Sequence, residues 1–310
     1  MIEIKNVSLT FKGGALDKKK GFTALDDVSI TVPEGCIYGF LGSNGAGKST
    51  LMRMICGIYK TEQGSITIDG EEVYDNPEAK KKIFFVNDET VQYADFTLEG
   101  LRKYYRSYYP DFSDEVYERL TAKLGLPTNK RMAEFSKGMK RQAVVIIGLS
   151  CMTKCLMLDE AFDGLDPAMR KVVKEMIVDE MLDRGATMIV SSHNVAEINE
   201  LCDRAMLIHK GKLIFADEID EIRSGFRKVQ LVDKKRVVPR GELELMGLRV
   251  MEYSATGRVA QAIIKGTETE IDEKISSLGI DIAETIPLTL KEIFIYELQA
   301  RGYGNVISEN

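Results

Sequence analysis

The stretch Gly42-Ser43-Asn44-Gly45-Ala46-Gly47-Lys48-Ser49-Thr50 matches the pattern G-x-x-x-x-G-K-[ST] at every position. It follows an apolar run, residues 36–41, and precedes a run of helix formers, residues 51–56. A strand, a glycine-rich loop and a helix in this order build a phosphate site, because backbone N–H groups and the helix N-terminus converge on the phosphate oxygens. We expect Lys48 to reach the β- and γ-phosphates of a nucleoside triphosphate and the Ser49 hydroxyl to bind Mg²⁺.

Composition indicates a folded, soluble chain. Its 310 residues leave room for one large α/β domain and a smaller one, and 44% of them are hydrophobic. The net charge of −6 argues against a general nucleic-acid binder. The five cysteines, an odd number, lie mostly in apolar runs and predict reduced, buried thiols of a cytoplasmic chain.

No run reaches the roughly 18 to 20 apolar residues that span a bilayer. The longest, residues 143–152, contains Gly148 and Ser150. The N-terminus alternates apolar and polar residues, which predicts a strand and not a signal peptide. A function at a membrane would therefore require a partner protein.

The pattern along the chain predicts an α/β core that a helical insertion divides. Residues 2–11 alternate and predict an antiparallel edge strand. From Thr97 to about Ser150 the pattern is helical. The other strands and helices of the core are predicted at residues 24–32, 64–70, 83–86, 156–158, 168–183 (helix), 187–191, 195–201 (helix), 205–208 and 213–215.

Two domains are predicted. Residues 1–224 form the nucleotide-binding domain, with the helical insertion at about 90–152. Residues 225–310 form a small α+β accessory domain at the C-terminal end. Within it, strands are predicted at 229–238, 248–253 and 259–264, and helices at 271–278 and 290–299.

Two carboxylates follow the apolar run Cys155 to Leu158. A strand that ends in Asp-Glu places both at the C-terminal edge of a parallel sheet, where ligands bind in such folds. Asp159 would hold Mg²⁺, directly or through water, and Glu160 would polarise the attacking water as a general base. An ordinary strand with an acidic turn is the alternative. The phosphate loop favours the functional interpretation.

Each of the two histidines has a different predicted role. His193 follows another apolar strand in Ser191-Ser192-His193, where its side chain could donate to the γ-phosphate. His209 precedes a Lys-Gly-Lys turn and is predicted to be structural.

Together these motifs resemble the nucleotide-binding subunit of an ATP-binding cassette (ABC) transporter, over about residues 1–220. The family's signature, usually Leu-Ser-Gly-Gly-Gln, corresponds to residues 135–139, where Ser136 and Gly138 match but Lys137 and Met139 do not. Its aspartate loop corresponds to Gly164-Leu165-Asp166-Pro167. The resemblance implies a P-loop NTPase fold with a parallel sheet, an antiparallel β part and a helical insertion.

The resemblance also implies that the ATPase works as a pair. Ser136, Gly138 and the helix behind them would bind the γ-phosphate of ATP held by the partner's residues 42–50, since N–H groups at a helix start suit an anion. ATP would join two subunits, homo- or heterodimeric, and hydrolysis would release them. Lys137 adds a positive charge near that phosphate.

Two further positions follow from the family pattern. An aromatic ring near the end of the first strand would stack on adenine, and Phe11 is the preferred candidate over Phe22. Asp88 stands where the family has glutamine. Its carboxylate could ligate Mg²⁺ and act near the catalytic centre, although it cannot donate a hydrogen bond as an amide does.

An aromatic cluster marks the insertion: Tyr104, Tyr105, Tyr108, Tyr109 and Phe112 lie beside Arg102, Lys103 and Arg106. One interpretation is a packed helix face with a solvated basic flank. The other is a groove for a short cytoplasmic helix of a membrane partner, because aromatic residues and Arg favour interfaces. Stacking on nucleic acid is poorly supported by the acidic total charge.

The resemblance thus implies an ATP-hydrolysing subunit that uses Mg²⁺ and drives a separate permease. It would be cytoplasmic and peripheral on the inner face of the membrane. The single cassette and the signature sequence resemble exporter ATPases for drugs and peptides. One alternative is a soluble ABC ATPase that acts on ribosomes or DNA, and another is a phosphotransferase with a small acceptor.

Overall fold

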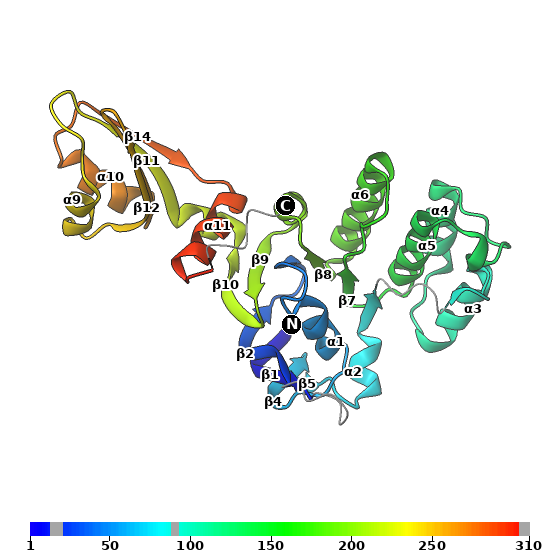
Figure 1. The fold of residues 1–310 in the computed structure, drawn as a ribbon. Coiled ribbons are helices and arrows are strands. Elements are labelled where there is room, and N and C mark those ends of the chain that lie inside the picture. The colour runs from blue at the N-terminus through cyan, green and yellow to red at the C-terminus, as the bar shows by residue number, and fades with distance from the viewer. Residues whose placement is uncertain (13–20, 88–92, 304–310) are drawn as a thin grey trace. The chain divides into compact units, whose positions relative to one another are not determined.

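The computed structural model describes residues 1–12, 21–87 and 93–303 (Figure 1). These residues form two compact units, Met1–Ala216 and Asp217–Asn310. The division falls a few residues before the predicted 224/225 boundary, because helix α8 (Ile219–Ser224) belongs to the second unit. Among the helices of the described ranges, none has both the length and the apolar character needed to cross a membrane.

A six-stranded sheet, ordered β10-β9-β3-β8-β7-β6, forms the centre of the first unit. Strands β9, β3, β8, β7 and β6 run parallel. Every residue of β3, β7 and β8 is buried, as expected for parallel strands with both faces covered. The strands are β3 (Ile37–Leu41), β6 (Ile83–Val86), β7 (Cys155–Asp159), β8 (Thr187–Ser192), β9 (Arg204–His209) and β10 (Lys212–Glu218).

A second, antiparallel sheet has the order β2-β1-β4-β5. Its strands are β1 (Ile2–Phe11), β2 (Phe22–Val32), β4 (Gln63–Ile68) and β5 (Glu71–Glu72). The prediction that β1 is an edge strand was wrong, because β1 pairs with β2 on one side and with β4 on the other. Alternation reports which face of a strand is buried, and it does not report how many neighbours the strand has.

Helices connect the parallel strands and build the insertion between β6 and β7. Helix α1 (Lys48–Ile55) follows β3, and α2 (Pro77–Lys81) precedes β6. The insertion contains α3 (Leu98–Tyr108), α4 (Asp114–Leu124), a 3₁₀ turn at Met132–Glu134 and α5 (Lys137–Ser150). Helix α6 (Pro167–Arg184) links β7 to β8, and α7 (Val195–Leu201) links β8 to β9.

The second unit contains a β-α-β-β-α-β run with sheet order β12-β13-β11-β14. Its core is apolar and includes Val229, Leu231, Ala262, Ile264 and Ile271. The elements after α8 are β11 (Phe226–Val232), α9 (Arg240–Leu245), β12 (Arg249–Thr256), β13 (Val259–Lys265), α10 (Glu268–Ser276), β14 (Ile282–Pro287) and α11 (Leu290–Ala300).

Several features of this unit differ from the sequence prediction, among them helices α8 and α9, which were not predicted. The strand predicted at 229–238 ends at Val232, because the Asp233 and Asp281 carboxylates accept from the backbone N–H groups of Lys235 and Lys234 and hold a turn there. Strand β14 was not predicted. It is an edge strand with mostly exposed residues, so the sequence lacks a clear buried alternation there.

Candidate functional site

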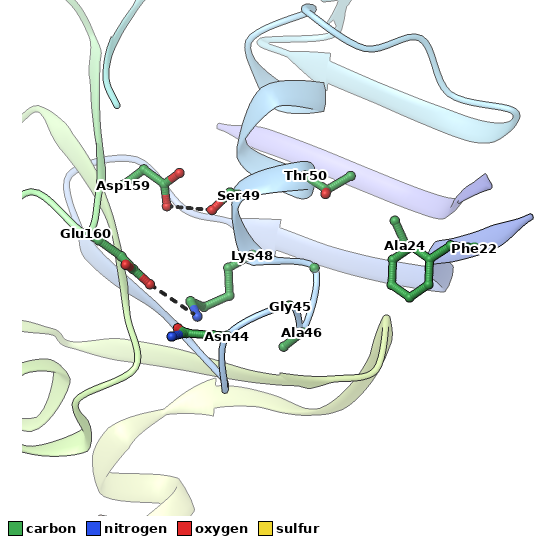
Figure 2. Close-up of a pocket in the computed structure, with 11 residues that line it drawn as sticks. Phe22, Ala24, Asn44, Gly45, Ala46, Lys48, Ser49, Thr50, Asp159 and Glu160 are labelled. Carbon is green, nitrogen blue, oxygen red and sulfur yellow. Dashed lines mark hydrogen bonds and ion pairs between the residues drawn. The ribbon is translucent and has the colours of Figure 1, made fainter. Parts of the chain in front are cut away.

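The glycine-rich loop lies between β3 and α1 and borders a cavity of about 300 Å³ (Figure 2). Gly47 precedes α1 with φ of 115°, and no side chain caps the first N–H groups of this helix. A Cβ atom at Gly47 would lie 2.7 Å from the Ala24 carbonyl oxygen, so glycine is required there. The loop therefore presents uncapped backbone donors at a helix N-terminus, the arrangement that suits an anion. The cavity is lined by Phe22, Ala24, Asn44, Gly45, Ala46, Gly47, Lys48, Ser49, Thr50, Asp159 and Glu160.

The Lys48 ammonium group is held inside this loop. Its side chain is only 4% exposed, and Nζ donates to the carbonyl oxygens of Gly42 at 2.7 Å and Ser43 at 3.2 Å. Burial lowers the pKa of Lys48, while the carboxylates of Glu160 and Asp159 act in the opposite direction. The carbonyl oxygens of Gly42 and Ser43 and the nearby Glu160 carboxylate thus hold the ammonium group at the edge of the cavity.

Asp159 and Ser49 bring two oxygen ligands together. The Ser49 hydroxyl donates to Asp159 Oδ1 at 3.0 Å, and the Ser191 hydroxyl donates to the same oxygen at 2.5 Å. Asp159 is buried at the end of β7, so its position is fixed by the sheet and by these two bonds. A carboxylate and a hydroxyl are the hard oxygen ligands that Mg²⁺ prefers, so these residues fit a magnesium ion.

Glu160 contacts a lysine and a histidine, and Figure 2 shows its contact with Lys48. Its Oε1 lies 3.7 Å from Lys48 Nζ and 3.6 Å from His193 Nδ1. The residue has a φ of 47°, which is uncommon for a non-glycine residue, and its N–H donates to the hydroxyl of Ser191 at 3.1 Å. Glu160 follows β7 and His193 follows the neighbouring strand β8, so the two strands place the carboxylate and the imidazole side by side.

Asp163 also belongs to this cluster, and it was not singled out in the sequence. Ligand atoms of Asp163, Glu160 and His193 all lie within 4.8 Å of one another. The only available signal was the position of Asp163 within the acidic run after β7. Spacing along a turn does not reveal on which side a carboxylate lies.

Ser136 and Gly138 are not part of this cavity. Ser136 is exposed and caps α5, since its Oγ accepts from the Met139 N–H at 3.2 Å. Gly138 is half-buried, and a Cβ atom there would lie 3.5 Å from the Gly164 carbonyl oxygen. The signature residues therefore present a helix start at the surface instead of contributing to the phosphate loop of their own chain.

The structure favours Phe22 over Phe11 as the aromatic residue of the site. The two residues pair across strands β1 and β2, but only Phe22 lines the cavity. The Phe11 ring packs edge-on against Tyr59, with ring centroids 5.6 Å apart. Spacing alone could not determine how the two strands are registered, so the choice of Phe11 for adenine stays a prediction, and the cavity gives Phe22 the better position. Phe22 is 60% exposed, so its ring face is available to a ligand.

The remaining predicted positions are only partly described. Asp88 lies outside the described residues. His209 is buried, and burial together with the neighbouring Lys210 lowers its pKa. That environment suits the structural role predicted for His209.

Known proteins of one kind resemble this chain. A family model described as "ABC transporter" matches residues 25–163. The bacitracin transport ATP-binding protein BcrA of Bacillus licheniformis is 35% identical, over 91% of this chain and 94% of its own length. The ABC transporter ATP-binding protein YtrB of Bacillus subtilis (strain 168) is 27% identical, over 95% of this chain and 97% of its own.

Solved structures resemble about seven tenths of this chain. A chain described as an ATP-binding subunit of an ABC transporter is 27% identical, with a TM-score of 0.61 over 72% of this chain and 92% of the other. The dimeric bacterial ABC transporter cassette MJ0796 is 20% identical, with a TM-score of 0.63 over 71% of this chain and 99% of the other. At that identity the second likeness concerns the fold alone.

Proposed function

The chain belongs to the family of ABC transporter ATP-binding proteins, and we propose that its Glu160 activates water for ATP hydrolysis while a second subunit completes the site. As a member of this family it is the ATP-binding and ATP-hydrolysing subunit of a transporter, and it drives a membrane permease. The observation that carries the proposed role is the position of Glu160, 3.7 Å from Lys48 and 3.6 Å from His193.

The residues of the site have distinct proposed roles. Residues 42–50 bind the phosphates through backbone N–H groups, and Lys48 neutralises the β- and γ-phosphates. Ser49 and Asp159 hold Mg²⁺, which lowers the charge of the phosphates when it is bound. Glu160 accepts the proton of the attacking water, and His193 donates to the γ-phosphate beside it. The ring of Phe22 stacks on the adenine.

We place the other half of the site on a second ATPase subunit. Ser136 begins a helix of 14 residues and is exposed, so its helix start can approach ATP held by a partner chain. Lys137 lies beside it and adds one positive charge. Its side chain runs along Gly164, where an added Cβ atom would come within 3.0 Å of Lys137 Cδ. A composite site of this kind makes dimerisation dependent on ATP.

We propose that the permease docks at a hollow of about 370 Å³ between α2 and α3. Its lining is aromatic on the α3 side and basic on the α2 side, and consists of Pro77, Lys80, Lys81, Tyr104, Tyr105, Tyr108 and Tyr109. Arg102 and Arg106, which the sequence suggested as the basic flank, instead pair with Asp114. A short helix with apolar and acidic side chains fits this surface.

Docking there would place the chain on the cytoplasmic face of the membrane. The direction of transport is proposed as export, in line with the resemblance to drug and peptide exporter ATPases. The name of BcrA refers to bacitracin transport, which is a property of that protein. For this chain we propose only that the substrate is exported, without naming the substrate.

The test is affinity capture of the tagged chain from detergent-solubilised membranes. We expect a polytopic membrane protein in stoichiometric amount, and we expect Tyr104→Ala with Tyr108→Ala to lose it while ATP binding is retained. Lys103→Ala, on the same helix, is the matched control. Capture of ribosomes or DNA instead would support the soluble alternative.

A separate activity assay tests the phosphotransferase alternative. Transfer of phosphate to a small acceptor, without release of inorganic phosphate, would support a phosphotransferase.

A further inference from the structure

A buried charged network lies behind the candidate site, on helices α6 and α7. Lys174 and Glu197 are each only 7% exposed. Lys174 Nζ lies 3.5 Å from Glu197 Oε1 and 2.9 Å from Glu200 Oε2. None of the three residues lines the phosphate cavity. Removing such charges from water is costly, and an apolar pair of similar volume is often equally stable. The charged pair therefore needs a reason other than stability.

One end of the network holds the loop that carries His193. Glu197 Oε2 accepts a hydrogen bond of 2.7 Å from the Ser192 hydroxyl, and that hydroxyl accepts one of 3.0 Å from the Asn194 N–H. Ser192 is buried, whereas the His193 side chain between these two anchored residues is exposed. The Glu197 carboxylate and the Ser192 hydroxyl thus fix the backbone on both sides of His193.

The other end of the network reaches the segment that follows Glu160. Lys174 Nζ lies 5.5 Å from the centre of the Phe162 ring, a cation–π contact. Phe162 is buried, and it follows Glu160 by two positions. Lys174 therefore contacts the Glu160 segment through Phe162 and the His193 loop through Glu197.

We propose that Lys174, Glu197 and Ser192 are positioning residues that set the distance between Glu160 and His193. Glu197 holds the His193 loop through Ser192, and Lys174 neutralises the buried Glu197 and fixes its direction. This inference rests on the proposed roles of Glu160 and His193. It adds residues that are not among those lining the phosphate cavity.

Two double variants of the full chain isolate the hydrogen bond from the charge. Both replace Lys174 with methionine, so neither leaves a buried unpaired charge. Glu197→Gln keeps an acceptor oxygen for Ser192, whereas Glu197→Leu removes it. We expect the Leu variant to lower kcat about 10- to 100-fold relative to the Gln variant, the size of effect that a misplaced catalytic group produces. The KM for MgATP should stay similar in the two variants, and the Leu variant should unfold only a few degrees lower, because its buried Ser192 hydroxyl loses an acceptor. Lys171→Met with Glu175→Gln, an exposed pair on the same helix, is the control.

The outcomes separate this inference from the proposed function. Equal kcat values in the two double variants would overturn the inference, as would a fall in kcat that only follows a loss of folded protein or of ATP affinity. Glu160→Gln and His193→Ala are measured in parallel. Wild-type turnover in both of these would refute the proposed roles of Glu160 and His193, and with them the basis of the network. If Glu160→Gln and His193→Ala lose turnover while the two double variants have equal kcat values, only the inference about the network is refuted.

Discussion

The substitution Glu160→Gln keeps the size of the side chain and removes its charge and its ability to accept a proton. General-base catalysis contributes about 10²- to 10⁴-fold to a rate. The expected loss in kcat is of this size, or about 2.7–5.4 kcal/mol in the activation barrier at 1.36 kcal/mol per tenfold. Lys48, Ser49 and Asp159 are unchanged in this variant, so phosphate and Mg²⁺ binding should remain.

The structure also predicts how the substitution affects ATP affinity. Glu160 Oε1 lies 3.7 Å from Lys48 Nζ, and at an effective dielectric constant of about 20 the attraction is about 4 kcal/mol before solvation is counted. Because the Glu160 side chain is partly exposed, the net worth of such a pair is nearer ~0–1 kcal/mol. Its loss removes one carboxylate that competes with phosphate for Lys48. We expect the dissociation constant for ATP to stay the same or to fall by up to about fivefold.

The assay combines phosphate release, equilibrium binding of a fluorescent ATP analogue and size-exclusion chromatography with MgATP. The variant should bind ATP, release phosphate slowly and accumulate as an ATP-bound dimer. Glu175→Gln, an exposed carboxylate on α6, should behave as wild type in all three. Wild-type phosphate release by Glu160→Gln, with ATP bound normally, would refute the assignment of Glu160 as the base.

Three further predictions concern other parts of the first unit. Gly47→Ala should weaken ATP binding at least about tenfold in a binding titration, because its φ of 115° and the 2.7 Å approach to the Ala24 carbonyl oxygen exclude a side chain. Phe22→Ala should weaken ATP binding about 5- to 100-fold and Phe11→Ala less than about twofold, since stacking on a base is worth about 1–3 kcal/mol; equal effects would refute the choice of Phe22. Burial lowers the pKa of His209 from 6.5, so the unfolded chain binds its proton more readily and stability should fall as the pH drops below 6.5. Denaturation with urea at several pH values should show a flatter dependence for His209→Gln.

The residue types of the phosphate site could be predicted from the sequence. Residues 42–50 match a pattern whose glycines and lysine have no common alternative use between a strand and a helix. The buried strands β3, β7 and β8 were predicted because continuous apolar runs bounded by turns are typical of parallel core strands. Asp159, Glu160 and His193 could be named because they follow such strands, and parallel strands bring their carboxyl ends to one edge.

Strand neighbours and side-chain directions depended on the tertiary structure. The sequence could not show that β1 has partners on both sides, because its alternation is the same at an edge and in the middle of a sheet. Nor could it choose between Phe11 and Phe22, because both rings end strands and only the register of β1 with β2 assigns one of them to the cavity.

The same distinction applies to the charged groups around Glu160. The order of motifs along the chain indicated the residues that we propose carry the chemistry. Only the folded chain brought Asp163 beside Glu160 and His193, and only it joined Lys174 to Glu197 behind them. These residues come from different elements, and a sequence records the type of a side chain without the direction in which it points. The distances between charges, on which catalysis depends, are therefore a property of the packing.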